Sequence, residues 1–154
     1  MSVDAPVIER VITIEAAPET VFRLLTDSRE YAKWKGQRAE LDARPGGIFR
    51  VIFPQPATVV AGKFIELVPQ RRVVFSWGWE GNEHVPPGSS RVEIDLEPVG
   101  SGTRLRLVHR DLPVPALAQH AEGWDMFLPR LTAVAEGRPA GTDIPSAIQD
   151  HATK

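Results

Sequence analysis

The stretch HAEGWDMFLPRLTAVAE, residues 120–136, decides the fold of this chain. Its large apolar residues recur at a spacing of i, i+3, i+4, i+7 and i+10. They are Trp124, Phe127, Leu128, Leu131 and Val134. A period of 3.6 residues places them on one face of a helix, with the polar residues off that face. Such a helix needs an apolar surface to cover it, so we interpret the upstream chain as a sheet that wraps around it.

The upstream segments have the alternation and turn signals of β-strands. The expected strands cover residues 7–15, 37–43, 47–53, 58–68, 72–79, 90–97 and 103–110. Ala17-Pro18 and the D-x-x-E pattern of residues 27–30 begin two short helices after the first strand. Strands with one polar and one apolar face indicate an antiparallel sheet. The paired glycines of residues 44–47 favour a hairpin turn over a phosphate loop, because no Gly-Lys-Ser/Thr follows.

Charges on the last two strands predict how those strands pair. Residues 90–97 place acidic side chains opposite their apolar face, and residues 103–110 place arginines there. We expect Asp95 and Glu93 to lie opposite Arg104 and Arg106 on neighbouring antiparallel strands, with their side chains in solvent. Each such pair contributes only about 0.2–1 kcal/mol, yet together they help to set the register.

Pro129 lies inside the apolar stripe of the final helix. An interior proline removes a backbone hydrogen bond and clashes with the preceding turn, at a cost of about 3 kcal/mol. We therefore expect a kink near residues 125–126. The helix itself is expected to begin near Pro115 or Ala116, and the stripe to continue on both sides of the kink.

Composition limits the classes of function. The chain has 154 residues, 42% of them hydrophobic and 25% charged, which suits one globular domain. A net charge of −2 argues against a nucleic-acid partner. The absence of cysteine excludes thiolate nucleophiles and cysteine-ligated metals. No apolar run has membrane-spanning length and no signal peptide is evident, so we expect a cytoplasmic protein without membrane insertion.

Aromatic residues on the expected inner surface suggest a pocket for an apolar or aromatic ligand. The alternative is that they only fill the core. The candidate ligand-binding residues are Trp34, Phe49, Val51, Phe64, Phe75, Trp77, Trp79, Leu107, His109, Trp124, Phe127 and Leu131. Trp77 on the sheet and Trp124 on the helix are the strongest of these candidates.

Four polar residues need a separate interpretation. His109 ends a strand and faces inward, where an imidazole can act as a general base or bind a ligand carbonyl. A buried histidine satisfied by its neighbours is the more frequent case. We expect His84 and His120 at the surface. Arg10 shares a face with apolar residues and either meets a ligand carboxylate or, as we favour, sits where the strand leaves the core.

No motif for metal, nucleotide or covalent chemistry is present. The four histidines have no metal-ligand spacing, no glycine-rich dinucleotide fingerprint occurs, and no serine, histidine and acid are grouped locally. We therefore expect neither a metal site nor a cofactor.

Several short motifs together resemble a known superfamily. They are IER (8–10), APxxVF (17–22), TD (26–27), WxG (34–36), DxRPGGxF (42–49), GxxxExxP (62–69), FSW (75–77), GTxL (102–105) and HxxGW (120–124). Their order and spacing over residues 7–137 resemble the START-like (SRPBCC, helix-grip) superfamily. The similarity is to the branch related to activators of the heat-shock-protein-ninety ATPase.

This resemblance implies an α+β fold, in which a seven-stranded antiparallel sheet wraps around a long C-terminal helix and two short helices follow the first strand. The domain then covers residues 7–137, between a flexible N-terminus, 1–6, and a C-terminal tail, 138–154. Superfamily members include lipid carriers, hormone receptors and polyketide cyclases, so fold alone does not set the function.

We favour binding or carriage of a small hydrophobic molecule, lipid-like or aromatic, between sheet and helix, without covalent catalysis. One alternative is an enzyme of the polyketide cyclase or hydrolase type with His109 as general base. Another is a chaperone-ATPase regulator that acts through protein–protein contact. The sequence is compatible with a homodimer and with a chaperone partner, and it does not decide between them.

The tail generates a first testable prediction. Residues 138–154 contain proline, glycine and polar residues without a sustained apolar period. We expect deletion of residues 142–154 to leave the melting temperature nearly unchanged in differential scanning calorimetry. A fall of many degrees would show that the tail docks on the domain or on a partner subunit.

Overall fold

A computed structural model describes residues 7–35, 38–53 and 58–140. The strands are β1 (Ile8–Ile14), β2 (Arg38–Leu41), β3 (Ile48–Phe53), β4 (Thr58–Val68), β5 (Arg72–Trp77), β6 (Ser90–Val99) and β7 (Gly102–Arg110). The helices are α1 (Pro18–Thr26), α2 (Ser28–Lys35) and α3 (Val114–Ala135). Residues 1–6, 36–37, 54–57 and 141–154 lie outside this description, and with them the expected flexible N-terminus and most of the expected C-terminal tail.

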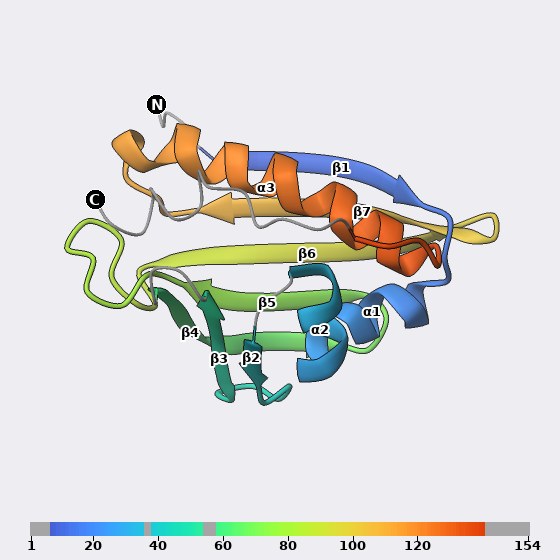
Figure 1. Ribbon diagram of the computed structural model, residues 1–154, viewed down its shortest axis with the longest axis horizontal. Helices are drawn as coiled ribbons and strands as arrows, with labels where there is room; N and C mark the ends of the chain where they lie inside the picture. Colours follow the sequence, from blue (N-terminus) through green and yellow to red (C-terminus); the bar gives the residue numbers. More distant parts are fainter. Residues whose placement is uncertain (1–6, 36–37, 54–57, 141–154) are drawn as a thin grey trace, which may run out of the picture.

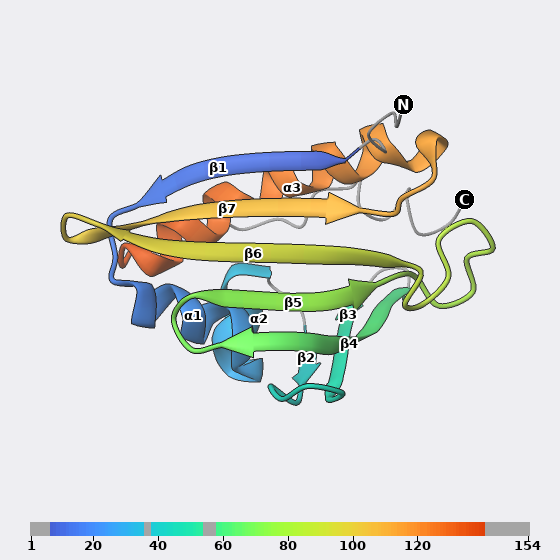
Figure 2. The same ribbon diagram turned by 180° about the vertical axis from the view of Figure 1, so that it is seen from behind.

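All seven strands form one antiparallel sheet in the order β1-β7-β6-β5-β4-β3-β2. Figure 1 shows α3 running along one face of this sheet, with α1 and α2 beside it on the same face. Seen from behind, in Figure 2, the strands lie in front of all three helices. This arrangement confirms the predicted α+β helix-grip fold. No helix within the described residues is long and apolar enough to cross a membrane.

The two short helices begin where the sequence signals lie. Pro18 occupies the first turn of α1, where its missing N–H needs no helical partner. The Asp27 Oδ1 atom accepts the backbone N–H groups of Arg29 and Glu30, 3.0 and 3.1 Å away, and so caps α2. Pro18 and the Asp27 cap therefore mark the starts of the two helices, as the sequence predicted.

Helix α3 is continuous from Val114 to Ala135, through Pro129. Its buried face is longer than the predicted stripe. The buried residues are Ala116, His120, Gly123, Trp124, Phe127, Leu128, Leu131 and Ala133. His120 is 6% exposed, so its expected surface position is wrong. The physical reason is its spacing, because His120 lies four residues before Trp124 and therefore on the same helix face.

The register of β6 and β7 differs in part from the prediction. The two strands pair antiparallel as predicted, but the register is shifted by two residues. Arg106 lies opposite Asp95, Arg104 lies opposite Glu97, and Glu93 lies opposite Val108. The hairpin closes with Val99 opposite Gly102, and this tight turn fixes every pair behind it. Turn geometry therefore decided the register, and charge matching followed it.

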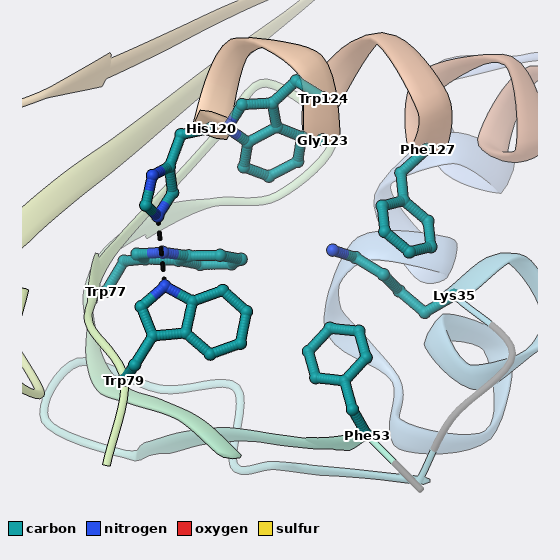
Figure 3. Close-up of a pocket in the computed structure, with 8 residues that line it drawn as sticks. All are labelled: Lys35, Phe53, Trp77, Trp79, His120, Gly123, Trp124 and Phe127. Atoms are coloured by element: carbon teal, nitrogen blue, oxygen red, sulfur yellow. Dashed lines mark hydrogen bonds between the residues drawn. The ribbon is translucent and has the colours of Figure 1, made fainter. Parts of the chain in front are cut away.

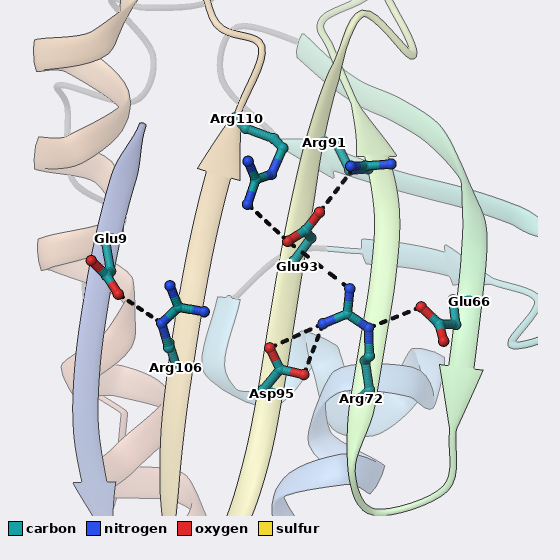
Figure 4. Close-up of polar contacts among 8 residues, drawn as sticks. All are labelled: Glu9, Glu66, Arg72, Arg91, Glu93, Asp95, Arg106 and Arg110. Atoms are coloured by element: carbon teal, nitrogen blue, oxygen red, sulfur yellow. Dashed lines mark hydrogen bonds and ion pairs between the residues drawn. The ribbon is translucent and has the colours of Figure 1, made fainter. Parts of the chain in front are cut away.

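Ion pairs on the outer face of the sheet run across several strands (Figure 4). Arg72 on β5 lies 2.8 Å from Asp95, and Arg106 lies 2.6 Å from Glu9 on β1. Glu93 has only 12% of its side chain exposed, so it does not lie in solvent as expected. Three arginines form ion pairs with it. They are Arg91 at 3.0 Å, Arg110 at 3.1 Å and Arg72 at 4.0 Å.

Arg10 on β1 forms an ion pair with the helix. Its Nε atom lies 2.6 Å from the Asp125 carboxylate of α3, with 33% of the arginine side chain exposed. Arg10 lies within β1, between the buried Ile8 and Ile14, so the favoured interpretation that it sits where the strand leaves the core is not confirmed. The ion pair lowers the pKa of Asp125 and ties β1 to the helix.

The packing of α3 predicts the effect of truncating its central leucine. Leu131 is fully buried, so Leu131→Ala is expected to lower the free energy of unfolding by about 2–5 kcal/mol. The matched control Leu117→Ala, at a partly buried position of the same helix, should cost clearly less. Urea denaturation monitored by circular dichroism measures both. A loss below about 1 kcal/mol for Leu131→Ala would contradict the assignment of α3 as the core helix.

Candidate functional site

A small cavity of about 20 Å³ lies between the sheet and α3. Its lining combines residues of α2, β3, β5 and α3 with Trp79, just after β5. These residues are Lys35, Phe53, Trp77, Trp79, His120, Gly123, Trp124 and Phe127. Figure 3 shows their side chains converging on one space. The volume suits about one water molecule, so the aromatic rings already fill most of the room between sheet and helix.

Lys35 is the unusual residue of this cavity. It is the last residue of α2, is 2% exposed, and points its ammonium into the cavity (Figure 3). Five aromatic rings lie within 6 Å of Nζ. The distances from Nζ to the ring centroids are 4.2 Å for Phe127, 5.1 Å for Trp124, 5.3 Å for Trp34, 5.3 Å for Trp77 and 5.8 Å for Tyr31.

No carboxylate forms a salt bridge with Lys35 in the described part of the chain. Cation–π contacts stabilise a desolvated ammonium by roughly 0.5–2 kcal/mol. The loss of hydration costs several kcal/mol. The desolvation cost is therefore larger than the stabilisation by the cation–π contacts. Burial, and secondarily the like charge of Arg130, lower the pKa of Lys35 to about 7. Near neutral pH this site therefore holds a lysine that is partly neutral and able to take up a proton.

His109 is buried against Trp77 and Trp124, with both ring nitrogens in hydrogen bonds. The Trp124 indole N–H donates to His109 Nδ1 at 3.0 Å, so Nδ1 carries no proton. His109 Nε2 therefore donates to Ser90 Oγ, 2.9 Å away, and Ser90 in turn donates to the Trp77 carbonyl. Burial, helped by His120 and Lys35, lowers the pKa of His109 well below its ordinary value. The imidazole is neutral and offers no unoccupied nitrogen to a substrate.

A hydrogen bond between Trp79 and His120 separates the cavity from an outer hollow. The Trp79 indole N–H donates to His120 Nε2 at 3.1 Å (Figure 3), and His120 Nδ1 lies 2.9 Å from the Ala116 carbonyl oxygen. The outer hollow measures about 280 Å³. Its lining shares Trp79 and His120 with the inner cavity and adds Asn82, His84, Val85, Pro113, Pro115, Ala116 and Gln119. One pair of side chains thus stands between the two spaces.

Two other buried polar groups near Lys35 lack partners. The Tyr31 hydroxyl and the Trp77 indole N–H have no hydrogen-bond partner among the described residues. Burial raises the pKa of Tyr31, so its hydroxyl keeps its proton. Unpaired buried donors cost roughly 1–3 kcal/mol each, and such groups in a native fold call for an explanation.

The twelve residues predicted to bind ligand are all buried, and they divide into two groups. Trp77, Trp79, Trp124 and Phe127 line the inner cavity. The other eight do not border it. Trp34, Phe49, Val51, Phe64, Phe75, Leu107, His109 and Leu131 pack in the surrounding core. Phe49 and Phe75, for example, stack on each other with centroids 4.1 Å apart.

Sequence reasoning missed four residues that line the cavity. They are Lys35, Phe53, His120 and Gly123. A helical signal was available for two of them, since Tyr31 and Lys35 are four residues apart, as are His120 and Trp124. Both polar residues therefore share a face with aromatic ones. No group of His, Asp and Glu suited to a metal ion occurs among the described residues.

Comparison with known proteins places this site in a family. Residues 15–136 match the family model of the Activator of Hsp90 ATPase homolog 1-like proteins. The chain belongs to this family. The human Activator of 90 kDa heat shock protein ATPase homolog 1 is 24% identical over 116 residues, which are 75% of this chain. The chain spans about a third (32%) of that human relative.

Two solved structures have the same fold. An AHSA1-like protein from Rhizobium etli is 44% identical, with a TM-score of 0.70, and the match covers 91% of this chain and 88% of that one. DynU16, a protein of the dynemicin biosynthetic locus, is 24% identical with a TM-score of 0.76. That match covers 89% of this chain and 50% of DynU16. At this identity the likeness to DynU16 concerns the fold alone.

Burial of Lys35 predicts how stability depends on pH. The pKa of Lys35 is about 7 in the folded chain and near its ordinary value of 10.5 when unfolded, so between these values the unfolded state binds more protons. Stability then rises with pH across this window. Relative to Lys35→Met, the wild type should gain about 2 kcal/mol from about pH 7 to about pH 9. Urea denaturation at both pH values measures the difference, and a constant difference would contradict a depressed lysine pKa.

Proposed function

We propose that this protein binds a small apolar or aromatic molecule between the sheet and α3. The observation that carries the proposal is the arrangement of two spaces around one hydrogen-bonded pair. An aromatic inner cavity of about 20 Å³ and an outer hollow of about 280 Å³ meet at Trp79 and His120. Ligand sites are concave, mostly apolar and typically about 300–1,000 Å³ in volume. The outer hollow lies near the lower end of that range before any side chain moves.

Access to the inner cavity requires rotation of Trp79 or His120. The hydrogen bond that joins them contributes only about 0.5–1.5 kcal/mol net, so its opening is a small barrier compared with unfolding. A ligand ring that replaces the displaced indole keeps the aromatic contacts of Trp77 and Trp124. The ligand thus first occupies the outer hollow and then reaches the rings behind it.

Catalysis by His109 is not favoured by the geometry. Its two nitrogens are occupied by Trp124 and Ser90, and its side chain is fully buried. A general base must reach the proton that it removes, directly or through one water. We therefore assign His109 a structural role, in which it orients Trp124 over the cavity.

A second candidate function follows from the family. The human relative is named an activator of a chaperone ATPase, so a contact with a chaperone is the alternative for this chain. This role needs an exposed surface and not a cavity. Measurement of chaperone ATPase stimulation tests it independently of any small ligand.

Tryptophan fluorescence tests the binding proposal. Three of the four tryptophans line the inner cavity, so a bound fatty acid, sterol or flavonoid should change their emission in a saturable titration. Gln119→Phe, which narrows the outer hollow, is expected to weaken binding about tenfold or more. Ala118→Phe is the matched control, because Ala118 is exposed on the same helix and does not line the hollow. No saturable change with any compound would contradict the proposal and favour the chaperone role.

A further inference from the structure

The side chains that line the cavity include one cation and several hydrogen-bond donors, but none of them is a carboxylate. Lys35 is 2% exposed, lies among five aromatic rings, and forms no salt bridge within the described residues. Trp77, which lines the same cavity, has an indole N–H for which the described part of the chain supplies no acceptor. Tyr31, whose ring lies 5.8 Å from Nζ, has a hydroxyl that is likewise unpaired within that part of the chain. A buried cation and two unpaired donors together call for a partner that supplies oxygen acceptors and a negative charge.

We propose that this site binds a small aromatic carboxylic acid, with the carboxylate on the Lys35 ammonium and the ring against Trp77, Trp124 and Phe127. The inference rests on the proposed function and names the class of ligand. A charge-assisted hydrogen bond to the carboxylate replaces the hydration that Lys35 lost on folding. The rings around Nζ offer the ligand's aromatic part stacked and edge-to-face contacts. A neutral lipid gives Lys35 no such partner, so the free-energy cost of burying the ammonium is not compensated.

A carboxylate is favoured over a larger anion because of the space available. The inner cavity holds about one water, and the outer hollow is about 280 Å³. One or two fused rings with a carboxyl group fit these volumes once the Trp79–His120 pair opens. A nucleotide or a diphosphate does not fit, and it also needs more cationic groups than a single lysine.

Proton linkage gives the proposal a distinctive signature. The other titratable or charged groups that face Lys35 are Arg130 and His120 on α3, His109 on β7, and Tyr31 on α2. Only a protonated Lys35 pairs with the acid, and its pKa in the free protein is about 7. Binding at alkaline pH must therefore be accompanied by uptake of a proton. The affinity for the acid should fall about tenfold per pH unit above neutrality, whereas the affinity for an ester should not change.

Calorimetric titration with 2-naphthoate and its methyl ester tests the inference. In the wild type at about pH 6 we expect the acid to bind about tenfold or more tightly than the ester. This preference should nearly vanish at about pH 8.5. Lys35→Met should abolish the preference while it keeps the affinity for the ester. Lys33→Met, an exposed neighbour on α2, is the matched control and should behave as the wild type.

The wild type alone provides a second measurement if Lys35→Met does not fold. Titrations with the acid in two buffers of different ionisation enthalpy at about pH 8.5 should show uptake of nearly one proton per bound acid. Equal binding of acid and ester, or no proton uptake, would overturn the inference and leave the proposed function intact. Failure of the wild type to bind either compound or any other apolar probe would overturn both.

Discussion

The structure depends on the burial of one apolar helix face against a curved antiparallel sheet. Helix α3 presents Trp124, Phe127, Leu128 and Leu131 to the sheet, each 4% exposed or less. Burial of side chains of this size stabilises by roughly 1.5–3 kcal/mol each. Without α3 the inner face of the sheet would lie open to water, and the short helices α1 and α2 would lose one wall of their own packing. The interior site is a consequence of this arrangement, since it lies where the side chains of the helix and the sheet do not fill the space between them completely.

The polar groups in that interior are not equivalent. His109 is satisfied on both nitrogens and stays neutral, so it fixes the positions of Trp124 and Ser90. His120 links α3 to the segment after β5 through its hydrogen bond with Trp79, at the boundary of the outer hollow. Lys35 differs from both, because the described residues offer its ammonium aromatic faces and no carboxylate. The cost of burying this ammonium is the reason to ask which ligand binds beside it.

The fold was largely predictable from local signals, and the site was predictable only in part. The stripe of residues 120–136, the Asp27 cap and the alternation of residues 90–97 each follow from a single periodicity or a single hydrogen-bonding rule. The register of β6 and β7 could not be predicted in this way. Charge matching allowed two pairings, and the hairpin with Val99 opposite Gly102 determined which of them formed. Lys35 and His120 were missed for another reason. Polarity argues for the surface, whereas their spacing from Tyr31 and Trp124 argued for the core, and tertiary packing decided in favour of spacing.

The protonation state of Lys35 tests this account most directly. Nuclear magnetic resonance of the lysine side chains, with the Lys35 signal assigned by comparison with Lys35→Met, gives the pKa of the ammonium in the folded protein. The account predicts a titration midpoint of about 7, because burial among aromatic rings disfavours the charged form. A midpoint near the ordinary lysine value of 10.5 would show that the ammonium is hydrated or paired, and would contradict an unpaired cation in the cavity.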